Sequence, residues 1–261
     1  MSEQEPTAEK LKVRPLRIGM VGATASGKTA LAGLVGEEWG IKPIEERFRE
    51  NPYLPKFYAN PRENGISFKC QFHFLGLKAE DMAVSTLELE EYQIISSTTE
   101  SVEVFVPSDE MDALYTKVQH DMKMMDDREW DIYKKARTTL KQCAIIDTDL
   151  DLVLNAPPDV LYARIIDVRG RDFEQREFFE DNPDYLPRLA TAVSVWGWMK
   201  KEAGEKPIVL IDSVSNNFVS NAKDREKILE QIENEITDFL SKNSHGKDGT
   251  QFIIPDFLKV K

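Results

Sequence analysis

Short apolar runs alternate along the chain with longer segments in which apolar residues recur every three or four positions. The apolar runs have the length of β-strands and lie at 16–22, 41–45, 93–97, 150–156 and 207–212. The periodic segments between them predict helices at 30–39, 67–91, 109–142, 160–168, 185–203 and 223–242. Strands that alternate with helices predict an α/β fold, in which a doubly wound, mostly parallel, five-stranded sheet is flanked by helices on both faces.

The chain shows no internal repeat and no linker between the expected elements. We therefore expect one domain over residues 15–242. Residues 1–14 are polar and charged, which predicts a flexible tail, and residues 243–261 predict a second tail at the C-terminus.

One stretch between the first expected strand and the first helix is especially informative: Gly22-Ala23-Thr24-Ala25-Ser26-Gly27-Lys28-Thr29. It has the form G-x-x-x-x-G-K-T of a phosphate-binding loop, in the strand–loop–helix context that this motif requires. The glycines allow backbone N–H groups to converge on phosphates, and the helix N-terminus adds partial positive charge. Lys28 can reach the β- and γ-phosphates, and the Thr29 hydroxyl can ligate Mg²⁺. The motif predicts that the chain binds ATP or another nucleoside triphosphate, and a glycine-bearing turn before a helix is the alternative.

Charge and composition narrow the range of partners. The chain has 34 basic and 46 acidic residues and a net charge of −12, which argues against nucleic acid or an anionic membrane as the main partner. A small substrate in a locally basic pocket is compatible with this charge. Cys70 and Cys143 do not make a disulfide framework and fit a reducing compartment. No apolar stretch has the length of a membrane span and no targeting peptide is evident, so we expect a cytoplasmic protein.

Three further segments carry candidate chemistry. Glu45 and Glu46 follow the second expected strand, where a carboxylate can accept a proton from an attacking hydroxyl; a solvated charged turn is the alternative. The amide of Gln71 can read the edge of a nucleobase with two hydrogen bonds. Arg169 and Arg171 flank a glycine, which suits a closing lid that stabilises a transferring phosphoryl group. A charged helix C-terminus is the alternative for the arginine pair.

Taken together, these motifs resemble the deoxynucleoside kinase family, and the match covers most of residues 16–215. Beyond the phosphate loop, the resemblance is carried by Glu45-Glu46, Glu50-Asn51-Pro52-Tyr53-Leu54, Phe57-Tyr58-Ala59-Asn60-Pro61, Ser67-Phe68-Lys69-Cys70-Gln71, Arg169-Gly170-Arg171 with Glu174, and Leu210-Ile211-Asp212. The order and spacing of these segments are far more specific than any one of them. The resemblance implies a P-loop kinase fold with an arginine-bearing lid.

The resemblance also implies which residues bind the phosphate acceptor. Glu46 is similar to the general base for the sugar 5′-hydroxyl. Tyr58 and Glu174 are similar to the pair that holds the 3′-hydroxyl. Gln71 resembles the base-reading amide, and Lys78 falls where some members carry a base-contacting arginine.

On the donor side, the resemblance implies that residues 22–29 hold the triphosphate, with Lys28 and Mg²⁺ over the γ-phosphoryl group. Arg169 and Arg171 are similar to lid arginines that contact the donor phosphates. Asp212 stands at the start of the loop that packs against the donor adenine in relatives.

The chain departs from the family in one motif. The family carries an acidic–Arg–Ser motif after the third strand, whose arginine orients the catalytic glutamate and whose acidic residue helps to hold Mg²⁺. The matching region of this chain, residues 94–105, contains no arginine. Glu100 and Glu103 are candidates for holding magnesium, and Arg47 and Arg49 for supplying the missing positive charge.

The leading functional expectation is ATP-dependent transfer of the γ-phosphoryl group to the 5′-hydroxyl of a deoxynucleoside, with Mg²⁺ as cofactor. Two alternatives stay open. The missing motif arginine fits a nucleotide-binding relative without turnover that acts as a regulatory or interaction subunit. Arg47 and Arg49 would suit a nucleoside monophosphate kinase, because such an enzyme must hold the acceptor phosphate. Relatives are commonly dimers, so a homodimer is expected from the resemblance.

Overall fold

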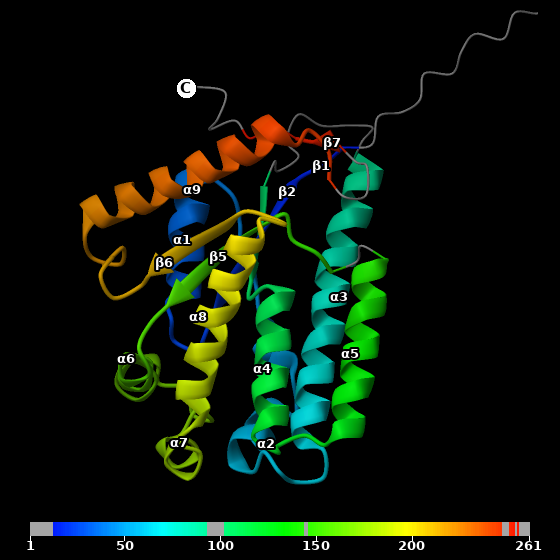
Figure 1. Cartoon of the computed structure of the whole chain (residues 1–261), viewed down its shortest axis with the longest axis vertical. Coiled ribbons are helices and arrows are strands. Elements are labelled where there is room, and N and C mark those ends of the chain that lie inside the picture. Colours follow the sequence, from blue (N-terminus) through cyan, green and yellow to red (C-terminus); the bar gives the residue numbers. More distant parts are fainter. Residues whose placement is uncertain (1–12, 93–101, 144–145, 247–250, 254, 256–261) are drawn as a thin grey trace, which may run out of the picture.

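The computed structural model describes residues 13–92, 102–143, 146–246, 251–253 and 255. Its central sheet has the strand order β3-β4-β2-β5-β6, and every neighbouring pair is parallel. The strands are β2 (Leu16–Gly22), β3 (Ile44–Glu45), β4 (Val102–Val106), β5 (Leu150–Asn155) and β6 (Ile208–Asp212). The chain runs from β2 to the edge strand β3, returns to β4 beside β2, and then crosses to β5 and β6 on the other side (Figure 1). The expected doubly wound α/β fold is confirmed.

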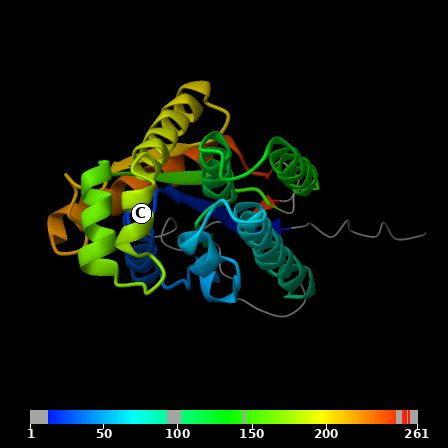
Figure 2. The same ribbon diagram turned by 90° about the horizontal axis from the view of Figure 1, so that it is seen from below.

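Helices cover both faces of this sheet (Figure 2), with α8 in yellow and α1 in blue on opposite sides. In chain order the helical elements are α1 (Lys28–Trp39), η1 (Phe48–Glu50), α2 (Leu54–Ala59), α3 (Ile66–Tyr92), α4 (Asp109–Asp121), α5 (Asp127–Gln142), α6 (Pro158–Ala163), η2 (Arg164–Arg169), α7 (Arg176–Asp181), α8 (Tyr185–Ala203) and α9 (Ala222–Lys242). The expected helical segment 109–142 is divided into α4 and α5. The reason is a capping box, in which the backbone N–H groups of Glu129 and Asp126 each donate to the other residue's side chain (2.7 and 3.1 Å).

The core lies on both sides of the sheet, as the alternation of side chains along β2 requires. Leu16, Ile18 and Met20 are buried in a cluster with apolar residues of α1 and α9. Val21 belongs to the opposite cluster, which includes residues of α4 and α8. All five strands end at the same edge of the sheet, because Glu45 pairs in register with Val106 at the ends of β3 and β4 and the neighbouring strands run parallel. Ligands of such sheets bind at this edge.

The strand next to β2 differs from the expected one. The expected strand at 93–97 lies outside the described residues, and β4 occupies 102–106 instead. A charged residue, Glu103, interrupts the apolar run of β4. Its charge is matched by Arg17, its register partner on β2, at 3.4 Å.

The two expected tails each contain a paired segment. β1 (Val13–Arg14) forms a parallel two-stranded sheet with β7 (Gln251–Phe252). The Phe252 ring is buried 5.6 Å from that of Phe239 on α9, and Arg14 forms an ion pair with Asp149 at 2.7 Å. The division into one domain and two tails stays a prediction, but these residues pack on the body of the fold.

Candidate functional site

The phosphate loop joins β2 to α1 at the carboxyl edge of the sheet. Two of its residues have a structural reason to be glycine. A Cβ atom at Gly22 would lie 2.4 Å from the Ser26 hydroxyl oxygen, and Gly27 has a φ of +104°, which a residue without a side chain adopts readily. The Ser26 N–H closes the turn by donating to the Ala23 carbonyl at 3.1 Å. Because α1 begins at Lys28, the free N–H groups of its first turn lie at the loop.

Lys28 holds its ammonium group within this loop. Nζ donates to the carbonyls of Gly22 (2.5 Å) and Ala23 (3.0 Å). The pKa of Lys28 is lowered to about 8, chiefly because the ammonium is buried and also because Arg169 is positively charged, while Glu46 acts in the opposite direction. An anionic phosphate beside the ammonium would therefore stabilise its charged form.

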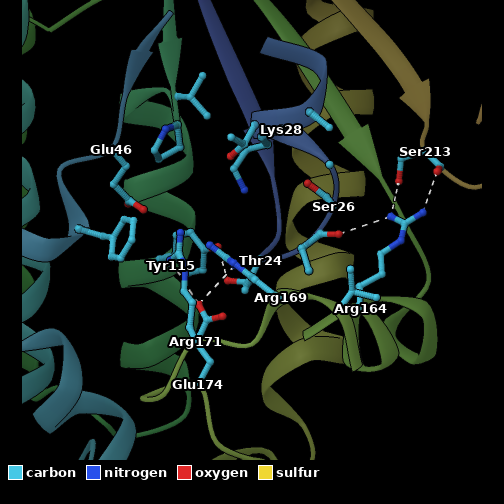
Figure 3. Close-up of a pocket in the computed structure, with 18 of the residues that line it drawn as sticks. Thr24, Ser26, Lys28, Glu46, Tyr115, Arg164, Arg169, Arg171, Glu174 and Ser213 are labelled. Carbon is cyan, nitrogen blue, oxygen red and sulfur yellow. Dashed lines mark hydrogen bonds and ion pairs between the residues drawn. The ribbon is translucent and has the colours of Figure 1, made fainter. Parts of the chain in front are cut away.

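One pocket, with a volume of about 700 Å³, brings most of the predicted site residues together (Figure 3). Lys28 and Glu46 project into the same space from different elements (Figure 3). The predicted residues that line the pocket are Thr24, Ala25, Ser26, Gly27, Lys28, Thr29, Glu46, Tyr58, Gln71, Arg169, Arg171 and Glu174. The predicted residues outside its lining are Gly22, Ala23, Lys78 and Asp212.

The pocket has two parts, which we name by their residues. The phosphate-loop end consists of residues 24–29, Arg164 and Ser213. The carboxylate end consists of Glu46, Tyr58, Gln71, Asp112 and Glu174.

Glu46 directly follows the edge strand β3. Glu46 is half-buried and its neighbour Glu45 is exposed, and both line the pocket. The negative charge of Glu46 acts on two other pocket residues, since it raises the pKa of both Lys28 and Asp112. The Glu46 carboxylate therefore lies within electrostatic reach of the ammonium in the phosphate loop.

Glu174 connects the lid to the carboxylate end. Its Oε1 pairs with Arg169 at 3.3 Å and with Arg171 at 3.5 Å. Its Oε2 is buried and has no hydrogen-bond partner among the described residues, so it is available to accept a bond from a bound molecule. Burial raises the pKa of Glu174, and the two arginines oppose this. Burial of the Tyr58 phenol and the negative charge of Glu174 both raise the pKa of Tyr58, to well above its usual range. This phenol therefore stays neutral.

Arg171 also rests on an aromatic ring that the sequence analysis did not single out. Its guanidinium carbon lies 3.7 Å from the ring centroid of Phe48. Phe48 is in η1, two residues after Glu46, so the lid touches the segment that carries this glutamate. A guanidinium over an aromatic face is a favourable cation–π contact.

Gln71 is almost fully buried on α3 and lines the carboxylate end. The Thr116 hydroxyl of α4, which donates mainly to the Asp112 carbonyl at 2.7 Å, lies 3.4 Å from the Gln71 Oε1. The Gln71 NH₂ group is left for other partners. Asp112 lies one turn earlier on α4 and was not predicted. Its pKa is raised to about 7, chiefly by burial, and Glu46 raises it further whereas Lys78 lowers it.

Lys78 does not reach the pocket surface. It is buried behind the carboxylate end, where Nζ donates to the Pro107 carbonyl at 2.5 Å. Its base-contacting role, implied by the resemblance, stays a prediction; in this arrangement Lys78 acts on Asp112 through its charge.

The motif region after the third strand needs a correction. The strand that lies beside β2 is β4 (Val102–Val106), so the residues that follow it are Pro107-Ser108-Asp109 and not residues within 94–105. No arginine occurs there either, so the departure from the family remains. Glu103 lies opposite Arg17, outside the pocket lining, and Glu100 lies outside the described residues.

Arg47 and Arg49 do not replace the missing arginine in this arrangement. The Arg47 guanidinium pairs with Glu80 (2.8 Å), Asp81 (2.9 Å) and Glu50 (3.2 Å). Arg49 and Arg47 are both absent from the pocket lining.

Arg164 is a pocket residue that sequence reasoning missed. Its guanidinium donates to the Ser213 carbonyl (2.9 Å), the Ser213 hydroxyl (3.2 Å) and the Ala25 carbonyl (3.4 Å). It therefore ties the phosphate loop to the loop after β6. Asp212 organises that second loop, because its carboxylate accepts bonds from the Val214 N–H (2.9 Å) and the Ser215 hydroxyl (2.6 Å). The signal for Arg164 was weak in the sequence, since it stands inside a helix, five residues before the lid arginine.

The loop and the strand ends offer hard oxygen ligands for a magnesium ion. Thr29, whose hydroxyl is the predicted magnesium ligand, and Glu46 line the pocket. Among the described residues, no group of three or more His, Cys, Asp or Glu side chains is placed to hold a metal by itself. Magnesium commonly takes one or two protein ligands and completes its shell with phosphate oxygens and water.

A sequence model of a family described as "Deoxynucleoside kinase" matches residues 18–238. This range contains the phosphate loop, both ends of the pocket and the lid. The chain belongs to the deoxynucleoside kinase family. The resemblance inferred from the motifs is therefore confirmed.

Several named proteins are similar to this deoxynucleoside kinase. The deoxyguanosine kinase of Lactobacillus acidophilus is 28% identical over 219 residues, which cover 82% of this chain and 88% of that protein. The deoxyguanosine kinase of Bacillus subtilis is 25% identical over 217 residues (82% and 95%). The deoxyadenosine kinase of Dictyostelium discoideum is 24% identical over 193 residues (69% and 73%). Because these proteins are kinases, the family membership makes this chain a phosphotransferase.

Solved structures support the fold of this deoxynucleoside kinase. The structure of a deoxyadenosine kinase from M. mycoides with bound dCTP covers 84% of this chain and 100% of that chain, with a TM-score of 0.63 and 18% identity. The structure of that enzyme with bound dATP gives a TM-score of 0.60 at 18% identity. The P-loop kinase fold is therefore confirmed. Over the described residues, the helices lack the combination of length and apolar character that crossing a bilayer requires.

Proposed function

We propose that the protein transfers the γ-phosphoryl group of ATP to the 5′-hydroxyl of a deoxynucleoside, with Mg²⁺ as cofactor. One observation carries this proposal: the phosphate loop and Glu46 line a single pocket, with the Lys28 ammonium and the Glu46 carboxylate within electrostatic reach of each other. A triphosphate in the loop and a sugar alcohol at Glu46 would then share one water-poor space, which favours transfer.

Each reacting group has a residue to act on it. Glu46 accepts the proton of the 5′-hydroxyl as the oxygen bonds to the γ-phosphorus. The bond from the γ-phosphorus to the bridging oxygen breaks, and ADP leaves with the electron pair. Lys28, Arg169 and Arg171 stabilise the negative charge on the transferring group. When bound, Mg²⁺ neutralises phosphate charge, and Thr29 is its protein ligand in this proposal.

The carboxylate end favours an uncharged acceptor over a nucleoside monophosphate. Its acidic residues Glu46, Asp112 and Glu174 would repel an additional phosphate. Arg47, the candidate for holding such a phosphate, is paired with acidic side chains outside the pocket lining. The free Oε2 of Glu174, beside the neutral Tyr58, instead suits a sugar hydroxyl.

The test is a transfer assay with γ-labelled ATP, Mg²⁺ and each of the four deoxynucleosides, alongside their 5′-monophosphates. We expect label in a nucleoside 5′-monophosphate and none in a diphosphate made from a monophosphate acceptor. Binding of ATP without transfer to any acceptor would overturn the proposal and favour a relative without turnover.

The two adjacent glutamates provide a matched pair of variants. Glu46→Gln removes the proposed base and is expected to lower kcat by about 10²–10⁴-fold. Glu45→Gln makes the same change one residue earlier, on an exposed side chain, and should leave kcat near the wild-type value. The reverse result would assign the base to Glu45.

We also propose that the protein forms a homodimer. Besides the family resemblance, α8 supports this, because Val195, Trp198 and Met199 expose large apolar side chains at helical spacing on one face. Sedimentation of the wild-type protein and of Trp198→Asp tests it: a monomeric wild-type protein at micromolar concentration would contradict the proposal.

A further inference from the structure

The phosphate loop contains a backbone conformation that its own sequence does not favour. Ala25 has a φ of +61°, in the left-handed region, where a residue with a Cβ atom is strained. Such a conformation persists when surrounding contacts hold it in place. The contacts around Ala25 are therefore informative about how the loop keeps its shape.

Two side chains from outside the loop hold the residues around this position (Figure 3). On one side, the hydroxyls of Thr24 and Tyr115 are 2.7 Å apart and share a hydrogen bond. On the other side, Arg164 donates to the Ala25 carbonyl and is fixed in turn by Ser213. Thr24 and Ala25 are thus held from α4 and from η2, two elements far from the loop in the sequence.

Tyr115 is placed to connect the two ends of the pocket. It lies on α4 one turn after Asp112, and both side chains line the pocket. The next residue, Thr116, donates its hydroxyl proton mainly to the Asp112 carbonyl (2.7 Å) and lies 3.4 Å from the Gln71 Oε1 at the carboxylate end. One turn of α4 therefore bonds to the phosphate loop through Tyr115 and contacts the acceptor amide through Thr116. Burial raises the pKa of the Tyr115 phenol, so it remains a neutral hydrogen-bonding group at physiological pH.

We propose that Tyr115 is a positioning residue, which acts through Thr24 to hold the phosphate loop in the conformation that binds the triphosphate. The inference rests on the proposed function in one respect, namely that the loop binds ATP. In this proposal Tyr115 does not contact the substrates. It changes the affinity for the donor because it hydrogen-bonds to the Thr24 hydroxyl.

The test is a double-mutant cycle of Tyr115→Phe and Thr24→Val, each of which removes a hydroxyl and keeps the shape of the side chain. The readout is calorimetric binding of Mg²⁺ and adenylyl imidodiphosphate, an ATP analogue that does not transfer its terminal phosphoryl group. Each single variant should bind roughly 2- to 12-fold more weakly, the range expected for one lost hydrogen bond. The double variant should bind no more weakly than the weaker single variant, because both changes remove the same bond.

Two controls separate this role from a general loss of structure. Thr24→Ser keeps the hydroxyl and should restore analogue binding relative to Thr24→Val. Tyr162→Phe removes a phenol from a half-buried tyrosine outside the pocket lining and should not change binding. The KM for the deoxynucleoside should stay unchanged in Tyr115→Phe.

Three results would overturn the inference. Losses that multiply in the double variant would show that the two hydroxyls act separately. A raised KM for the deoxynucleoside with normal analogue binding would show that Tyr115 contacts the acceptor. Binding by Tyr115→Phe equal to the wild type would show that the bond does not matter. If the wild-type protein bound no analogue at all, the proposed function itself would fall.

Discussion

The two ends of the pocket are built in different ways. The phosphate-loop end consists largely of one continuous stretch, residues 24–29, all of which line the pocket. The carboxylate end is assembled from side chains of distant elements: Tyr58 from α2, Gln71 from α3, Asp112 from α4 and Glu174 from the lid. The first end depends on local backbone geometry, whereas the second depends on how helices pack. Variants at the two ends should therefore change different steps of the reaction.

After Glu46→Gln, the largest expected effect is at the phosphate-loop end. Lys28→Met removes the buried ammonium from the phosphates and is expected to lower kcat by about 10²–10³-fold. Calorimetry should show deoxynucleoside binding nearly unchanged, because the hydrogen bonds that the Lys28 ammonium donates go to carbonyls of the loop. Lys56→Met, on an exposed part of α2, is the control. An equal loss of deoxynucleoside affinity would show that the two ends are not independent.

At the carboxylate end, Glu174→Gln weakens the bonds to both lid arginines and to a sugar hydroxyl. We expect kcat/KM for the deoxynucleoside to fall by about 10- to 100-fold, as for a lost charge-assisted hydrogen bond. The wild-type preference for a deoxynucleoside over the matching 2′,3′-dideoxynucleoside should disappear in this variant. Glu177→Gln, an exposed residue on α7, should retain that preference. A variant that still discriminates the 3′-hydroxyl would place its recognition elsewhere.

Asp112 gives the carboxylate end a dependence of stability on pH between about pH 4 and pH 7. Its folded-state pKa of about 7 lies above the model-peptide value of 3.8, so the folded protein binds this proton more tightly than the unfolded chain. The contribution of Asp112 to the free energy of unfolding therefore decreases as pH rises from about 4 to about 7. Asp112→Asn removes this dependence, and its stability relative to the wild type should rise by roughly 2–3 kcal/mol between pH 5 and pH 8. Denaturant unfolding of both proteins at pH 5 and pH 8 measures this change in relative stability. The same stability difference at the two pH values would contradict the raised pKa of Asp112.

The smallest expected effect tests the contact between the lid and the segment that carries Glu46. Phe48→Leu removes the aromatic face under Arg171 and keeps an apolar side chain. Loss of a partly exposed cation–π contact predicts a fall of about 2- to 5-fold in kcat. Phe72→Leu changes a more exposed phenylalanine on α3 and serves as the control. A larger effect in the control than in Phe48→Leu would remove Phe48 from the site.

The contrast between the two ends also explains what could be predicted from the sequence. The phosphate loop was predictable because its residues are contiguous and their spacing fixes their geometry. Asp112 and Tyr115 on α4 and Arg164 in the π-helical segment η2 were missed because, in a sequence that predicts a helix, a polar residue facing a pocket looks like one facing solvent. Within the sheet, β4 was missed because Glu103 breaks its apolar pattern, and the pairing with Arg17 balances that charge in the structure.

The pairing of β1 with β7 has a practical consequence for handling the enzyme. Val13 and Gln251 are side by side, so the first and last segments of the fold meet. They meet near the start of β2, whereas the pocket lies past its other end, at Gly22. A surface attachment made at β1 or β7 would therefore lie at the opposite end of β2 from the pocket. A short peptide joining the two segments would give a circular permutant, with new ends opened in a surface loop.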